Sequence, residues 1–277
     1  MVAQKTVPEA GSDTASETIL VFDSGLGGLT VYREIAAARP SADFVYVADD
    51  LAFPYGAMEE PALVSRVVAL MGKLIATHRP DLVVIACNTA STIALPELRK
   101  NFALPFVGTV PAIKPACAGS LTRRVSVLGT EATVKREYTH ALIRDYAGDC
   151  QVTLVGSNKL AAYAEAEFAG TPVADAAIAA EIEPCFRDDG ARTDTVVLAC
   201  THYPLIVDRL SRLAPWPVNF VDPAPAIARR VTDLLGGAAP PARPGTTRAA
   251  FTSGGAPTAA LARFGIRADH PEAAAAT

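Results

Sequence analysis

The chain has 277 residues, of which 50% are hydrophobic and 19% charged, and its formal net charge is −4. This composition is typical of a globular protein with room for two lobes, and it excludes a disordered chain. The negative charge favours neither direct nucleic-acid binding nor attraction to an anionic membrane, and no stretch reaches the ~20 uninterrupted apolar residues of a membrane span.

The N-terminal segment and the cysteines predict the compartment. Residues 1–17 contain no hydrophobic signal core, so we expect a polar leader there. An odd number of cysteines, without close spacing or a secretion signal, indicates free thiols in a reducing cytoplasm. Cys117, Cys150 and Cys185 are interpreted as small apolar core residues, whereas Cys87 and Cys200 follow strands and precede polar residues.

Short β-branched strands alternate with longer helices along the chain. Continuous apolar strands between helices predict the α/β class, with doubly wound and mainly parallel sheets. In chain order, we predict strands over 18–23, 43–50, 81–88, 105–110, 124–130, 150–157, 194–201 and 218–223, with the clearest helices over 29–40, 59–80 and 91–102.

The pattern contains an internal repeat. "DLVVIACNT" begins at Asp81 and "DTVVLACTH" at Asp194, an offset of 113, whereas "FVGTVPAI" at Phe106 and "FVDPAPAI" at Phe220 differ by 114. Similarity among buried strands does not explain a cysteine at the same strand end. The repeat therefore predicts two similar lobes related by a pseudo-twofold axis, with an active site in the cleft between them.

The lobes are expected to be discontinuous in sequence. We assign residues 1–110 and 226–277 to lobe one, and residues 111–225 to lobe two. Two segments rich in Pro, Gly, Ala or Thr, at 1–17 and 236–248, lack apolar periodicity, so we expect peripheral loops or disorder there.

Cys87 and Cys200 are the candidate catalytic residues. Ligands of open α/β sheets lie beyond the carboxyl ends of the strands, so both thiols are expected to face one cleft from opposite sides. Two bases on opposite faces of a carbon invert its configuration, and a thiol pKa near 8.5 needs only modest lowering for this role. Asp23 is a helper for the Cys87 side and His202 for the Cys200 side.

Neighbouring polar groups suit a carboxylate ligand. Ser24, Asn88, Thr89 and Thr201 supply hydrogen-bond donors close to the two cysteines. Gly56 lies in the turn "FPYGA", where its amide can approach a ligand closely.

Five motifs occur in one order: "FDSGLGGLTV", "YVADDLAFPYG", "ACNTAS", "VLGTEATV" and "ACTHYPLI". Together, over about residues 19–222, they resemble the signature set of the cofactor-independent glutamate racemases, in the aspartate/glutamate racemase superfamily. The resemblance implies interconversion of L- and D-glutamate by two cysteines, without metal or pyridoxal phosphate. It also implies D-glutamate supply for peptidoglycan, a homodimer and, for some relatives, activation by a peptidoglycan precursor.

By the same resemblance, Cys87 matches the thiol that deprotonates D-glutamate and Cys200 the thiol that deprotonates L-glutamate. Glu165 matches a glutamate near His202, although its surrounding motif is degraded, and no arginine precedes the Pro-Tyr-Gly turn. The substrate-contacting positions implied in this way are Asp23, Ser24, Pro54, Tyr55, Gly56, Asn88, Thr89, Thr130, Glu165, Thr201 and His202.

Other functional interpretations account for fewer of these sequence features. A zinc site would use Cys200 and His202, yet no Cys-x-x-Cys accompanies them. "DSGLGG" lacks the Lys-Ser/Thr of a phosphate loop, and a Cys-His hydrolase leaves the second cysteine strand unexplained. An amino-acid-binding protein without catalysis remains an alternative, as do racemases or decarboxylases acting on aspartate, hydantoins or malonates.

Overall fold

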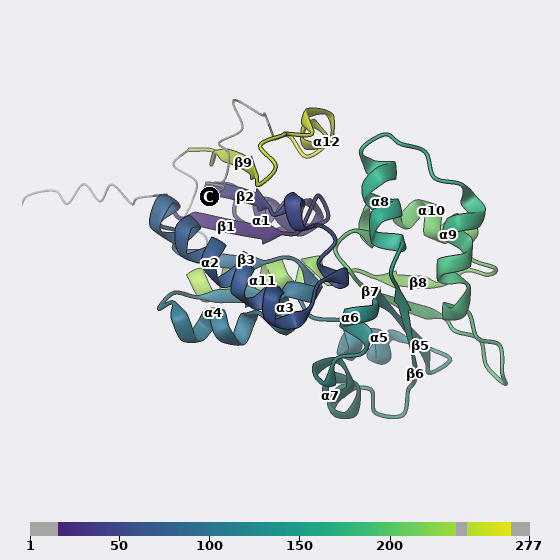
Figure 1. Cartoon of the computed structure of the whole chain (residues 1–277). Helices are drawn as coiled ribbons and strands as arrows, with labels where there is room; N and C mark the ends of the chain where they lie inside the picture. Colours follow the sequence, from purple (N-terminus) through teal and green to yellow (C-terminus); the bar gives the residue numbers. More distant parts are fainter. Residues whose placement is uncertain (1–15, 237–242, 267–277) are drawn as a thin grey trace, which may run out of the picture.

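The computed structural model describes residues 16–236 and 243–266, and in these residues the strands form two sheets (Figure 1). The first sheet has five strands in the order β4 (Phe106–Gly108), β3 (Leu82–Ile85), β1 (Thr18–Asp23), β2 (Asp43–Ala48) and β9 (Thr247–Phe251). The second has four, in the order β6 (Gln151–Ser157), β5 (Arg124–Thr130), β7 (Thr195–Ala199) and β8 (Asn219–Val221). Every pairing between these strands is parallel, which confirms the predicted α/β class.

The sheets carry the same strand order twice. The order β4-β3-β1-β2 in the first sheet corresponds to β8-β7-β5-β6 in the second, and β9 has no counterpart. The repeated cysteine strands are thus β3 and β7, and the repeated Phe-Val segments are β4 and β8, which occupy equivalent positions. The predicted duplication is confirmed at the level of topology.

Helices cover both faces of the first sheet because alternate residues of each strand point to opposite sides. Ile19 and Val21 of β1 belong to the core under α1 (Leu29–Ala38) and α11 (Ala224–Leu235), whereas Leu20 and Phe22 belong to the core on the other face. The helices of that other face are α2 (Glu60–His78), α3 (Asn88–Ile93) and α4 (Leu95–Asn101).

The second sheet is covered in the same way (Figure 1). One face packs against α8 (Leu160–Phe168), α9 (Asp175–Ile182) and α10 (Val207–Leu213). The other packs against α5 (Ile113–Gly119) and α7 (Glu137–Tyr146). The short helices α6 (Glu131–Val134) and α12 (Thr258–Ala262) complete the α-helices of the described residues, which also contain short 3-10 helices at Asp50–Ala52, Tyr55–Ala57, Glu183–Cys185 and Tyr203–Ile206.

The chain crosses between the sheets twice. Helix α5 follows β4 of the first sheet but packs against the second, and α11 follows β8 of the second but packs against the first. Each repeat therefore lends its last helix to the other lobe. The division into 1–110 with 226–277, and 111–225, remains a proposal, with crossings at 109–112 and 222–223.

Several predicted elements have different ends in the structure, and two of these differences have a local cause. The strand predicted to 88 ends at Ile85, and Cys87 instead caps α3, where its sulfur accepts from the amide of Ala90. The helix predicted over 91–102 is divided at Ala94 into α3 and α4, because Pro96 in the first turn of α4 has no N–H to continue the helix.

The loop predicted over 236–248 extends too far. Residues 237–242 lie outside the described residues, but Thr247 and Arg248 belong to β9. Strand β9 is an edge strand, held by backbone pairing with β2 alone. Half-exposed residues without apolar periodicity can therefore form it.

The predicted leader also ends earlier than residue 17. Residues 1–15 lie outside the described residues, but Glu17 forms an ion pair with the buried Arg39 at 2.6 Å. No helix described in the structure has the length and apolar character needed to cross a membrane.

Candidate active site

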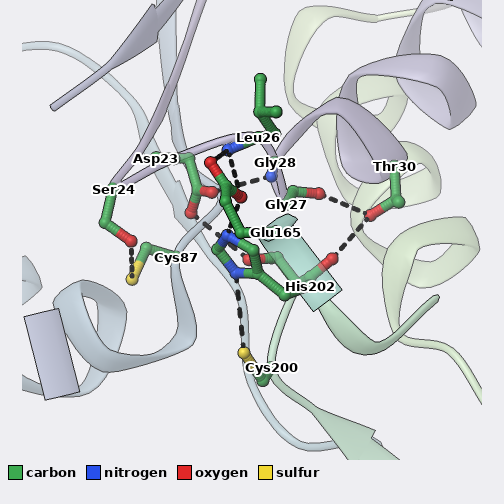
Figure 2. Close-up of polar contacts among 12 residues, drawn as sticks. Asp23, Ser24, Leu26, Gly27, Gly28, Thr30, Cys87, Glu165, Cys200 and His202 are labelled. Carbon is green, nitrogen blue, oxygen red and sulfur yellow. Dashed lines mark hydrogen bonds and ion pairs between the residues drawn. The ribbon is translucent and has the colours of Figure 1, made fainter. Parts of the chain in front are cut away.

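The candidate catalytic side chains meet between the two sheets, at the carboxyl ends of their strands (Figure 2). Asp23 is the last residue of β1, Cys87 follows β3, and Cys200 follows β7. This is where open α/β sheets place their ligands. Both cysteines are 6% exposed, so the two thiols lie inside the protein.

Cys87 lies at the start of α3, where two hydrogen-bond donors contact its sulfur. Its Sγ accepts from the amide of Ala90 at 3.5 Å and from Oγ of Ser24 at 3.7 Å (Figure 2). Burial raises the pKa of Cys87, as does the negative charge of Asp23, and the two donors counteract this only in part. These surroundings favour the protonated thiol of Cys87 in the free protein.

Cys200 begins a relay of polar contacts. Its Sγ lies 3.8 Å from Nδ1 of His202, and Nε2 of His202 lies 2.7 Å from Oε2 of Glu165 (Figure 2). The contact between His202 and Glu165 is an ion pair by distance, but its angles are not those of a directed hydrogen bond. Burial opposes a charged imidazole, but Cys200 and Glu165 outweigh it and raise the pKa of His202 well above its usual value. A protonated imidazole beside a cysteine stabilises the thiolate.

Asp23 accepts hydrogen bonds from both sides of the site. Its Oδ2 accepts from the amide of Gly28 at 2.8 Å, and its Oδ1 accepts from Oγ1 of Thr201 at 3.4 Å. Burial raises the pKa of Asp23, and the positive charge of His202 offsets only part of this rise.

Contacts across the lobes bring further predicted residues into the site. Glu165 of α8 accepts from the amide of Leu26, at 3.0 and 3.1 Å to its two oxygens. The hydroxyls of Thr89 and Thr130 lie 3.2 Å apart. A Cβ on Gly56 would lie 3.2 Å from Cβ of Thr130, so the Pro-Tyr-Gly turn also packs against the second lobe.

Asn88 presents a buried amide without a partner. Its side chain directly follows Cys87 and is 2% exposed, yet neither Nδ2 nor Oδ1 forms a hydrogen bond within the described protein. A buried, unsatisfied amide is costly unless a ligand supplies the missing partner. Asn88 is therefore suited to hold a small charged ligand beside Cys87.

Tyr55 is set back from this arrangement. Its hydroxyl donates to Oδ2 of Asp49 at 2.6 Å, and the same carboxylate pairs with Arg66 and accepts from Oγ1 of Thr252 at 2.8 Å. The hydroxyl is thus already used by the protein, and the contact available to a ligand from Tyr55 is its backbone. Pro54 begins the turn, and its carbonyl accepts from the amide of Ala57.

Sequence reasoning missed several residues of the site. Asp49 directly follows β2 and lies one residue beyond the register position of Asp23, which was a usable signal. No sequence signal marked Phe53, whose ring centroid lies 5.1 Å from that of His202. The same is true of Arg66 and Thr252, which contact Asp49. Within residues 16–236 and 243–266, no three metal-binding side chains come close enough to hold an ion.

Comparison with known proteins identifies the class. The glutamate racemase of Brucella canis is 55% identical over 234 residues, which cover 82% of this chain and 84% of the relative. The crystal structure of Escherichia coli glutamate racemase with L-glutamate and the activator UDP-MurNAc-Ala superposes with a TM-score of 0.81 at 40% identity, covering 91% of this chain and 96% of that one. A Thermus thermophilus glutamate racemase in complex with β-chloro-D-alanine gives 0.70 at 28% identity, covering 93% and 96%.

The fold and these relatives define an amino-acid racemase, an isomerase. The family model for Asp/Glu/hydantoin racemases matches residues 19–231, and the chain belongs to that family.

Proposed function

We propose that the protein interconverts L- and D-glutamate by proton transfer between two cysteines, Cys87 and Cys200. The observation that carries this proposal is the arrangement of the two thiols, which reach one buried site from the ends of equivalent strands. The identity to glutamate racemases supports glutamate as the substrate.

In the L-to-D direction, the Cys200 thiolate removes the α-proton. The C–H bond breaks, an S–H bond forms on Cys200, and the electron pair remains on the α-carbon and its carboxylate. Cys87 then donates its proton to the opposite face, which forms the new C–H bond and leaves a Cys87 thiolate. The raised pKa values of Cys87 and of His202, which lies beside Cys200, support this starting state.

Asp23 and His202 would tune the two thiols. His202, held by Glu165, stabilises the Cys200 thiolate, whereas Asp23 favours the protonated form of Cys87. Backbone and side-chain donors around Cys87 would bind the substrate. The proposed substrate-binding set is Asp23, Ser24, Pro54, Tyr55, Gly56, Asn88, Thr89, Thr130, Glu165, Thr201 and His202.

Solvent exchange tests the proposal directly. In D2O, the protein is expected to incorporate deuterium at the α-carbon of L-glutamate and to produce D-glutamate, followed by NMR and chiral chromatography. Exchange with aspartate or a hydantoin in place of glutamate would contradict the substrate assignment. Binding of glutamate without exchange would indicate an amino-acid-binding protein.

Asn88→Ala is expected to raise KM for glutamate by about tenfold, because a hydrogen bond to a charged ligand is lost. The free energy of unfolding should not fall, since the amide has no partner in the free protein. Asn101→Ala, at an exposed asparagine on α4, is the matched control and should leave KM unchanged. Loss of stability with an unchanged KM would show that Asn88 is structural.

The cellular role follows from the same activity. We propose that the protein is cytoplasmic and homodimeric and supplies D-glutamate for peptidoglycan. The activator bound to the Escherichia coli relative supports regulation of this chain by a peptidoglycan precursor.

A further inference from the structure

Phe168 links the two lobes beside the active site. It is the last residue of α8, on the second lobe, yet its side chain is 9% exposed and packs in the core cluster of the first sheet, with Leu26 and Leu261. Phe168 thus docks the end of helix α8 onto the opposite lobe.

Residues that follow α12 enclose this ring. The guanidinium of Arg263 lies 4.3 Å from the centroid of Phe168, and the ring of Phe264 lies 5.7 Å from it at an interplanar angle of 52°. Arg33 of α1 lies 6.0 Å from the centroid of Phe264 on the first lobe. We call Phe168, Arg263 and Phe264 the α8 clamp. Cation–π and aromatic pairs of this kind favour one relative position of the groups they join.

The clamp lies one helical turn from a contact of the active site. Glu165 precedes Phe168 by three residues, so both side chains lie on the same face of α8. Glu165 contacts Nε2 of His202 at 2.7 Å and accepts from the amide of Leu26 (Figure 2). Leu26 itself packs in the core cluster that contains Phe168. A displacement of the end of α8 would therefore move Glu165 relative to His202.

We propose that the α8 clamp positions Glu165 against His202, so that Arg263, Phe264 and Phe168 are positioning residues for the Cys200 half of the reaction. The proposal rests on the proposed two-cysteine function. Cys87 receives its contacts from Ser24 and Ala90 of the first lobe, so the Cys87 half should not depend on the clamp.

The test uses Arg263→Gln, which removes the cation, and Arg263→Lys, which retains it. Elimination of chloride from the L- and D-forms of a β-chloro glutamate analogue requires only one base and reports each thiol separately. Arg263→Gln should slow elimination from the L-analogue about two- to fivefold and leave the D-analogue unchanged, with substantial rescue in Arg263→Lys. Arg192→Gln removes a comparable pair, Arg192 over Trp216 at 5.0 Å, and is the matched control without effect.

A second readout does not require turnover. The charged groups that face His202 are Cys200 at the end of β7, Glu165 on α8 and Asp23 at the end of β1. In Arg263→Gln, NMR titration of the His202 imidazole should show a lower pKa than in the wild-type protein, because Glu165 is held less firmly.

The proposal is overturned if Arg263→Gln slows elimination from both analogues equally. It is also overturned if this variant changes neither the His202 titration nor the elimination rates. If the wild-type protein eliminates chloride from neither analogue, the proposed function fails. In that case, the His202 titration still decides whether the clamp positions Glu165.

Discussion

Cys87→Ser is expected to reduce racemisation of glutamate by about 10²–10⁴-fold or more, because one face of the α-carbon then has no competent base or acid. Serine has nearly the shape of cysteine, but its hydroxyl does not form an anion near neutral pH. Racemisation needs both groups, so loss of either one stops turnover in both directions. The measurement is the formation of each enantiomer from the other.

The two cysteines can be separated by a reaction that needs only one of them. A glutamate analogue with chloride on the β-carbon loses the α-proton to a thiolate and then releases chloride as the C=C bond forms. Cys87→Ser should still eliminate from the L-analogue, through Cys200. Cys200→Ser should still eliminate from the D-analogue, through Cys87. Cys185→Ser, at a buried cysteine of the second-lobe core, controls for the substitution itself.

Elimination is more informative here than racemisation rates. Two enantiomers have equal free energies, so kcat/KM must be the same in both directions for every variant. A defect of one thiol therefore lowers kcat/KM equally in both directions, and only kcat and KM taken separately can differ between the directions. Undiminished racemisation by Cys87→Ser would contradict the two-thiol assignment, as would loss of elimination from the same analogue in both serine variants.

The fold could be predicted because its signals are local. Apolar strands followed by helices lead to parallel sheets, and the repeated Asp81 and Asp194 segments are equivalent strands β3 and β7. Strand β9 was not predicted, because its pairing with β2 depends on backbone groups far apart in the sequence. The division of α3 from α4 had a local signal, Pro96, whose effect depends on where the helix begins.

The site was predictable only where a residue follows its own strand. Asp23, Cys87 and Cys200 are placed by strand ends, so their meeting follows from the doubly wound topology. Glu165 reaches His202 only because the two lobes dock through α8. Phe168 takes part in that docking, but its partners Arg263 and Phe264 lie far along the chain, so its role had no local signal in the sequence. The unpartnered amide of Asn88 is likewise a property of the folded site.

Gly27→Ala is expected to have a large effect on activity, although Gly27 is not one of the reacting groups. A Cβ at this position would lie 2.6 Å from Nδ1 of His202, 2.6 Å from Oγ1 of Thr201 and 2.8 Å from the backbone nitrogen of His202. The backbone atom cannot move aside as the end of a flexible side chain can. Either the loop after β1 or the segment that carries His202 must shift.

The shift would act on the Cys200 half of the site, because Nδ1 of His202 is the atom that faces Cys200. Misplacement of a reacting group by about 1 Å can cost about 10²-fold in rate, and overpacking costs about 1–3 kcal/mol of stability. We therefore expect kcat/KM to fall about 100-fold in Gly27→Ala, measured beside urea unfolding. Gly119→Ala is the matched control: this residue ends α5, and nothing lies within 4 Å of its added methyl group. Full activity in Gly27→Ala would contradict the close packing of this loop against His202.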